Sequence, residues 1–326
     1  MRKYLFIFLS FLLIGCGKNN DKDVLKNIKK KADNLESYTI QGELNMYNGE
    51  NKYTYAVDVN YKKEDFYRVS LVNKVNDHEQ IILRNKDGVY VLTPSLNKSF
   101  KFQSDWPYNN SQVYILERIL NDIDSDDEKT YEESDGLHVF TTKVNYSTNN
   151  ELVKQKIYFD KDHIMKKVEV FNKNDEVAME FNVSKFEENP RIEDDIFELN
   201  NNIDSSEVKD VSKTIDDIIY PMYLPANTYL TSQDRVNKDS GERVILTFGG
   251  DKSFTLIEET VTVGKELDMN LTYGEPDLII DTVGSIDDYT VNWMSNGIEY
   301  SLVSDNLEKE ELISVAKSIS SASITK

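Results

Sequence analysis

The sequence predicts a mainly β protein of the α+β class, with a long antiparallel sheet, covering helices and a smaller C-terminal α+β domain. From Tyr38 onward, apolar residues alternate with polar ones in successive segments, separated by turn signals such as Asn48-Gly49. Two stretches, 23–36 and 109–121, carry apolar residues at helical spacing instead. A polar segment at 189–211, rich in Asp, Glu, Asn and Ser, marks a boundary before a second pattern.

The first helix, expected at about 23–36, is amphipathic. Val24, Leu25 and Ile28 lie on one side and lysines on the other, and we interpret the lysine face as solvated, with favourable placement near an anionic membrane. Strands are expected next at 38–46, 53–61, 65–73, 78–86, 88–93 and 98–103. Consecutive hairpins of this kind predict an antiparallel sheet with one buried and one solvated face.

The second helix, expected at 109–121, has an unusually broad apolar face, which predicts that it is buried. Strands resume near 129–134, 137–146, 152–160, 164–171 and 176–187. A sheet of this length twists and curls, so the two helices could fill its concave side.

The C-terminal part, 212–326, is predicted to form a smaller α+β domain. Strands at 243–248 and 253–259 flank the turn Gly249-Gly250-Asp251-Lys252, and strands at 290–295 and 298–303 flank Asn296-Gly297. A final helix fits 308–319.

The N-terminus has the layout of an export signal. Arg2 and Lys3 precede an apolar stretch, Tyr4 to Ile14, that is too short to span a bilayer. The run Leu13-Ile14-Gly15-Cys16 resembles the lipobox of bacterial lipoproteins, which implies cleavage before Cys16 and a diacylglycerol on its sulfur. An ordinary secretory signal with a chance cysteine is the alternative. We therefore expect a signal peptide at 1–15, a lipidated tether at 16–22 and attachment to the extracytoplasmic face of the cell membrane.

Charge and cysteine content narrow the function classes. Loss of the signal leaves 36 Lys and Arg against 58 Asp and Glu, a net charge of −22. This balance argues against nucleic acid as a partner, because phosphate binding needs a basic patch. Cys16 is the only cysteine, so neither a disulfide framework nor a cysteine-based zinc site is available.

The sequence contains no recognisable catalytic or cofactor motif, so we expect a protein that is not an enzyme and has no cofactor or metal. The three histidines, His78, His138 and His163, are far apart in sequence. Asp122, Asp124, Asp126 and Glu133 match some positions of a calcium loop, but Asp127 stands where the sharp turn requires glycine. We interpret this segment as a solvated loop.

Several aromatic residues in the first part are candidates for a ligand cavity or a partner-facing surface. They are Tyr53, Tyr55 and Tyr61 on the second strand, together with Leu116 and Ile119 of the second helix. The alternative is that they form the core, with the second helix filling the concave face.

The 23–200 region resembles the LolA/LolB-like lipoprotein carrier superfamily. The resemblance runs in order through Asn34-Leu35-Glu36-Ser37-Tyr38, Asp87-Gly88-Val89-Tyr90-Val91 and Phe181-Asn182-Val183-Ser184-Lys185-Phe186. It implies a half-open antiparallel β-barrel with helices over the mouth. The 212–326 region looks like the domain that follows it in Gram-positive sporulation lipoproteins of the YdcC type, through Tyr220-Pro221-Met222-Tyr223-Leu224-Pro225. The first domain is also similar to the germination lipoprotein GerS, known as the partner of a spore-cortex amidase.

These observations predict a non-enzymatic, membrane-anchored lipoprotein of a spore-forming Gram-positive bacterium. It would bind a cell-envelope partner, such as a cortex-modifying amidase, in sporulation or germination. The alternative is a lipid or lipoprotein carrier that holds acyl chains in the half-barrel, and a third hypothesis is an envelope sensor. Because the same fold serves different functions, the resemblance alone does not decide among them.

Overall fold

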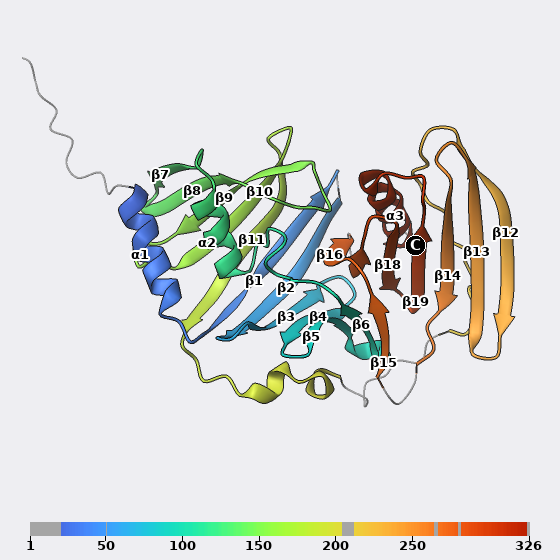
Figure 1. Ribbon diagram of the computed structural model, residues 1–326, viewed down its shortest axis with the longest axis horizontal. Coiled ribbons are helices and arrows are strands. Elements are labelled where there is room, and N and C mark those ends of the chain that lie inside the picture. Colours follow the sequence, from blue (N-terminus) through green and yellow to red (C-terminus); the bar gives the residue numbers. More distant parts are fainter. Residues whose placement is uncertain (1–20, 50, 204–211, 264–266, 280–281, 325–326) are drawn as a thin grey trace, which may run out of the picture.

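The computed structural model describes residues 21–49, 51–203, 212–263, 267–279 and 282–324 of the 326-residue chain. These residues form two sheets that lie side by side along the longest axis of the molecule, the first with two α-helices beside it and the second with one (Figure 1). We call residues 21–203 the first lobe and residues 212–324 the second lobe. The predicted fold class is confirmed, with a curled first sheet whose described strands leave it open rather than closing it into a barrel.

The first sheet has twelve strands in the order β15-β6-β5-β4-β3-β2-β1-β11-β10-β9-β8-β7. Those from the first lobe are β1 (Ser37–Asn48), β2 (Asn51–Lys62), β3 (Phe66–Asn73), β4 (Glu79–Asn85), β5 (Gly88–Thr93), β6 (Lys98–Phe102), β7 (Thr130–Ser134), β8 (Leu137–Lys143), β9 (Leu152–Phe159), β10 (Met165–Asn172) and β11 (Val177–Glu188). All neighbours among them are antiparallel. In strands such as β2 the period-two pattern places the apolar residues on one buried face, whereas β4 and β5 bury residues on both faces.

Gly42 on β1 marks a close approach within this sheet. The register between β1 and β11 shifts between Gln41 and Gly42. A Cβ atom at Gly42 would lie 2.4 Å from the backbone oxygen of Asn182 and 2.7 Å from the ring of Phe181. Glycine is therefore the residue that lets the two strands stay paired at this bulge.

Two helices, α1 (Asp21–Asp33) and α2 (Leu116–Ser125), contribute to the same hydrophobic core as the first sheet. The second helix begins later than the predicted 109–121. The backbone N–H of Ser111 donates to the carbonyl oxygen of Asn145, and the N–H of Ser147 donates to the side chain of Asn110. These bonds hold the preceding segment away from helical geometry, although Val113, Tyr114 and Ile115 are buried as predicted.

The outer face of the first sheet is covered in part by the segment that the sequence marked as a boundary. The short 3-10 helices η2 (Asp194–Phe197) and η3 (Leu199–Asn202) lie there, whereas η1 (Pro94–Leu96) connects β5 to β6. Phe197 is buried among Ile81, Leu83, Tyr90 and Leu92. The start of this segment is therefore packed structure and not only a linker.

The second sheet has seven strands in the order β12-β13-β14-β19-β18-β17-β16. They are β12 (Thr228–Lys238), β13 (Gly241–Gly250), β14 (Phe254–Thr260), β16 (Glu275–Ile279), β17 (Thr282–Ile286), β18 (Thr290–Ser295) and β19 (Ile298–Val303). Helix α3 (Lys309–Ile324) covers one face, where Leu312, Val315 and Ala316 join the core around Trp293.

The two lobes are joined by strand pairing and by buried polar contacts. Strand β15 (Asp268–Thr272) belongs to the second lobe but pairs in parallel with β6 at the edge of the first sheet. The side chain of Gln80 on β4 donates to the carbonyl oxygen of Val283 (3.0 Å) and accepts from its N–H (2.5 Å). It also accepts from the hydroxyl of Thr282 at 3.0 Å. The lobes therefore share a specific, hydrogen-bonded junction.

Among the described residues, no helix has the length and apolar character needed to cross a membrane.

Candidate interaction site

The five predicted cavity or partner-facing residues of the half-barrel lie in its core. Tyr53, Tyr55, Tyr61, Leu116 and Ile119 are all buried and belong to one continuous cluster. Tyr61 stacks on Tyr38 with ring centroids 4.8 Å apart. This burial favours the packed-core interpretation of these residues, and their role toward a ligand or partner stays a prediction.

Cys16, the predicted lipidation site, and the signal peptide before it lie outside the described residues. The first described residue, Asp21, opens α1 five positions later. Any lipid on Cys16 would therefore hold α1 close to the membrane surface, because five residues span at most about 18 Å.

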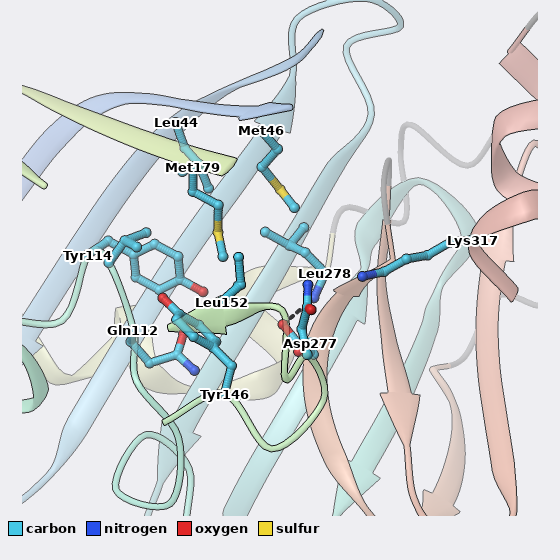
Figure 2. Close-up of a pocket in the computed structure, with 12 residues that line it drawn as sticks. Leu44, Met46, Gln112, Tyr114, Tyr146, Leu152, Met179, Asp277, Leu278 and Lys317 are labelled. Atoms are coloured by element: carbon cyan, nitrogen blue, oxygen red, sulfur yellow. Dashed lines mark hydrogen bonds between the residues drawn. The ribbon is translucent and has the colours of Figure 1, made fainter. Parts of the chain in front are cut away.

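A small cavity lies at the junction of the lobes, where the mouth of the first sheet meets β16 and α3. Its volume is about 40 Å³, and its walls include Met46 and Met179 of the first lobe and Asp277 and Lys317 of the second. Figure 2 shows the side chain of Lys317 extending from α3 toward this group. Such a volume fits at most a few water molecules and is far too small for an acyl chain.

The charged groups of this junction are deeply buried. Burial raises the pKa of Asp277, whose carboxylate also accepts a hydrogen bond from Thr148 on the first lobe. Burial lowers the pKa of Lys317. Because each group is less costly to bury when neutral, the pair is better suited to holding the lobes together than to binding a charged ligand from solvent.

The acidic residues of the weak calcium pattern are occupied by other parts of the protein. Asp122 is buried and accepts hydrogen bonds from Ser111 and Gln155. Asp124 forms an ion pair with Lys29 of α1, and Asp126 accepts from the backbone N–H of Lys143. Within the described ranges, no group of three or more His, Cys, Asp or Glu residues is arranged to hold a metal ion.

Two histidines that are distant in sequence meet beside α1. The rings of His138 on β8 and His163 in the β9–β10 turn are stacked, with centroids 5.8 Å apart. They line a surface cleft of about 430 Å³ together with Asp23 and Glu133. Burial and the neighbouring His138 lower the pKa of His163. Sequence spacing gave no sign of this pair, because strand register and turn geometry bring the rings together.

The edges of the two sheets differ in what they offer to a partner. The strand β7 has five residues and carries Glu132 and Glu133. The strands β15 and β16 also have five residues each and lie at the junction, where Asn270 of β15 donates to Glu299 of β19. In contrast, β12 has eleven residues and forms the far edge of the second sheet (Figure 1).

Strand β12 is exposed over almost its whole length. All nine residues from Tyr229 to Asn237 are exposed, although the strand is paired along one side with β13. Its outer edge therefore offers backbone N–H and C=O groups to an added strand. Of the exposed large apolar side chains, a group gathers on β12 and the segment before it: Tyr220, Met222, Tyr223, Leu224, Tyr229, Leu230 and Val236. We call these seven residues and the β12 edge the β12 surface.

The segment before β12 is held against the sheet by specific contacts. The hydroxyl of Tyr220 donates to the side chain of Gln233 on β12 at 2.5 Å. Ile215 is buried in the core of the second lobe, and its backbone N–H donates to Glu242 on β13. The exposed positions of Met222 and Tyr223 therefore follow from a fixed backbone and not from a loose terminus.

Sequence reasoning missed β12 as a strand. Its sequence, Thr-Tyr-Leu-Thr-Ser-Gln-Asp-Arg-Val-Asn-Lys, has no alternating apolar face, because neither side of the strand is covered. Two features of the sequence could have predicted this strand. The segment after Pro225 contains β-branched and aromatic residues, and only the two turn-forming residues Asp239-Ser240 separate it from the next strand.

Comparisons with known proteins agree with the predicted family. The family model described as "Sporulation protein YdcC-like" matches residues 2–197. The chain is 36% identical to "Sporulation protein YdcC" of Bacillus subtilis (strain 168) over 313 residues, which cover 94% of this chain and 93% of that protein.

Two solved structures show distant similarity. One is the CwlD amidase from Clostridioides difficile in complex with the GerS lipoprotein, with 17% identity, 54% of this chain and 97% of that chain covered, and a TM-score of 0.28. The other is the LolA superfamily protein NE2245 from Nitrosomonas europaea, with 10% identity, 56% and 99% covered, and a TM-score of 0.33. The family model and the Bacillus relative together cover most of the sequence, and the chain belongs to the YdcC-like family of sporulation proteins.

Proposed function

We propose that this sporulation protein is a non-enzymatic lipoprotein, anchored through Cys16 to the extracytoplasmic face of the cell membrane, that binds a protein of the cell envelope. The β12 surface would provide the binding site, and a cortex-modifying amidase is the partner class that we expect in sporulation or germination. The observation that carries the proposal is the exposed, eleven-residue edge of β12.

Strand addition is the binding mode that this edge supports. A partner segment in extended conformation would pair with the free backbone groups of β12, and its side chains would contact apolar residues beside the strand. Proteins usually protect an edge of this length with a helix, a loop or a row of charges. Here Asp234, Arg235 and Lys238 are the charged residues, and both cations lie against Glu242 and Glu259 of the same sheet.

The interior of the first lobe supports the binder over the acyl carrier. Leu116 and Ile119 of α2 pack with Tyr55 and Tyr61 in one core, so an acyl chain would enter only by displacing α2. The enclosed space at the junction amounts to about 40 Å³. A carrier of acyl chains would need a much larger hollow.

The test is recovery of a cell-wall amidase from sporulating cells with matched variants of the protein. Met222→Asp/Tyr229→Asp changes two apolar side chains of the β12 surface that are 75% and 62% exposed. Val75→Asp/Tyr289→Asp is the control, because these side chains are 77% and 61% exposed but lie elsewhere.

We expect wild type and the control to recover the amidase and the β12 variant to lose it. Equal recovery by all three proteins would remove the β12 surface from the proposal. Recovery of no protein, together with an acyl ligand seen by native mass spectrometry, would favour the carrier.

A further inference from the structure

The lysines of α1 divide into two groups by their contacts. Lys29 forms an ion pair with Asp124 at 2.6 Å, and Lys31 forms one with Glu188 at 2.7 Å. Lys22, Lys26 and Lys30 are exposed and take part in no ion pair with the described residues. The apolar side of the helix, including Val24 and Ile28, is buried in the first lobe. Packing therefore turns three unpaired cations toward solvent.

These lysines border a broad, shallow hollow of about 910 Å³ on the protein surface. Its lining holds five lysines, with Lys129 from the loop after α2 among them, and four aspartates. One of those aspartates, Asp124, already neutralises Lys29. The five lysines and four aspartates give this lining a net charge of +1, whereas the whole chain has a formal net charge of −20. Such a patch attracts anionic groups even though the protein as a whole repels them.

The position of α1 in the chain indicates which anionic surface it would meet. Cys16 precedes Asp21 by five residues, a span of at most about 18 Å. A lipid on Cys16 therefore keeps the start of α1 within roughly two Debye lengths of the phosphate headgroups at physiological ionic strength. Lysines held at such a surface each contribute attraction toward anionic lipids.

We propose that Lys22, Lys26 and Lys30 bind the phosphate headgroups of anionic lipids and thereby fix which end of the protein faces the membrane. This inference rests on the lipid anchor in the proposed function. Helix α1 and strand β12 lie at opposite ends of the longest axis of the molecule (Figure 1). The bound state would hold the β12 surface away from the membrane.

The junction between the lobes fixes the position of β12 relative to α1. Strand β15 pairs with β6, and Gln80 makes three hydrogen bonds to Thr282 and Val283. A hinge between the lobes would let β12 fold back toward the membrane, whereas this junction transmits the placement of α1 to the far end of the second lobe.

The experiment attaches the chain from Cys16 onward, which contains every described element, to vesicles by chemistry. Cys16 is the only cysteine, so a maleimide lipid couples at one position. One vesicle type contains phosphatidylcholine alone and the other also contains phosphatidylglycerol. Brief acetylation and mass spectrometry then report the accessibility of each lysine.

On phosphatidylglycerol vesicles we expect acetylation of Lys22, Lys26 and Lys30 to fall about fivefold relative to neutral vesicles, and high salt should reverse it. Lys52 and Lys213, which are exposed and do not line the hollow beside α1, are the internal controls and should react equally on both vesicle types. Equal acetylation of the α1 lysines on both vesicle types would overturn the proposal.

A pair of charge-reversal variants tests whether the positive charges of α1 cause this protection from acetylation. Lys26→Glu/Lys30→Glu keeps good helix formers in α1 and should abolish the protection of Lys22. Lys52→Glu/Lys213→Glu changes the total charge equally and should leave that protection intact. Protection of Lys22 that persists in the α1 variant would contradict the inference. Because attachment is imposed chemically, none of these results depends on whether cells lipidate Cys16 or on any protein partner.

Discussion

The backbone N–H of Ile219 donates a hydrogen bond to Oε1 of Glu258 across 3.0 Å. Glu258 lies on β14 and is completely buried, and its Oε2 has no hydrogen-bond partner among the described residues. Burial raises the pKa of Glu258 to about 7. The segment that leads to the β12 surface is thus fixed to the sheet by a carboxyl group that is protonated below neutral pH.

Glu258 should make the protein less stable as the pH rises. In the unfolded chain its pKa is near the ordinary 4.5, so between about pH 4.5 and pH 7 the folded state binds more protons than the unfolded state. The stabilisation from this group is present below that window and is lost as the pH rises through it. Glu258→Gln keeps an acceptor for Ile219 and should raise the free energy of unfolding at pH 8 by up to about 3 kcal/mol.

Urea unfolding at several pH values measures this effect. Asp234→Asn, a change of an exposed carboxylate on β12, is the control and should leave the pH dependence nearly unchanged. If Glu258→Gln gave the same pH profile as wild type, the burial of Glu258 would have no energetic consequence.

Gln80 should couple the unfolding of the two lobes. Gln80→Leu removes its three hydrogen bonds and leaves buried backbone groups of Val283 without their partner, at a cost of about 3 kcal/mol. Trp106 lies in the core of the first lobe and Trp293 in that of the second, so single-Trp variants report each lobe by fluorescence. We expect one shared transition in wild type and two in Gln80→Leu.

The control for Gln80→Leu is the same substitution at Gln41. It is exposed and donates to Asp58 on the neighbouring strand. Gln41→Leu should keep the shared transition, and loss of coupling in this variant too would mean that the junction contact is not specific.

Leu116→Trp tests whether α2 fills the half-barrel. Leu116 is buried in the core, so the larger ring should overpack it and lower the free energy of unfolding by about 1–3 kcal/mol. Leu116→Met, which nearly conserves volume, should cost less. Thermal unfolding checks both, and an undiminished transition temperature for Leu116→Trp would indicate space for a ligand beneath α2.

Cys16→Ala should release the protein from the membrane fraction without changing its fold, because every described element begins at or after Asp21. Two acyl chains give stable anchoring, whereas a protein with a formal net charge of −20 gains nothing from an anionic surface as a whole. Cell fractionation measures the change. Lys18→Ala is the neighbouring control and should stay with the membrane.

The sequence predicts best where one face of a strand is buried. Strands such as β2 and β14 agree with their predicted positions within two residues, because burial of one face imposes a period of two. The Asn296-Gly297 turn also lies between two paired strands, and both residues have positive φ, as a type I′ turn requires.

The missed features depend on contacts that no local pattern records. Strand β12 is held by pairing with β13 alone, so it needs no apolar face. The start of α2 is set by bonds from residues near Ser111 to a loop more than thirty residues away. The β12 surface is therefore harder to predict from the sequence than the core, since packing does not constrain which residues stand at exposed positions.

The pairing of β15 with β6 has a consequence for biogenesis. Lys98 and Asp268 form an ion pair across these strands although they are 170 residues apart. During synthesis, the chain would thus carry an unpaired β6 edge until the last fifth of the polypeptide is made, and such edges recruit other strands. We expect nascent or truncated products that lack β15 to aggregate or to require a chaperone, because only a chain that includes β15 covers the β6 edge.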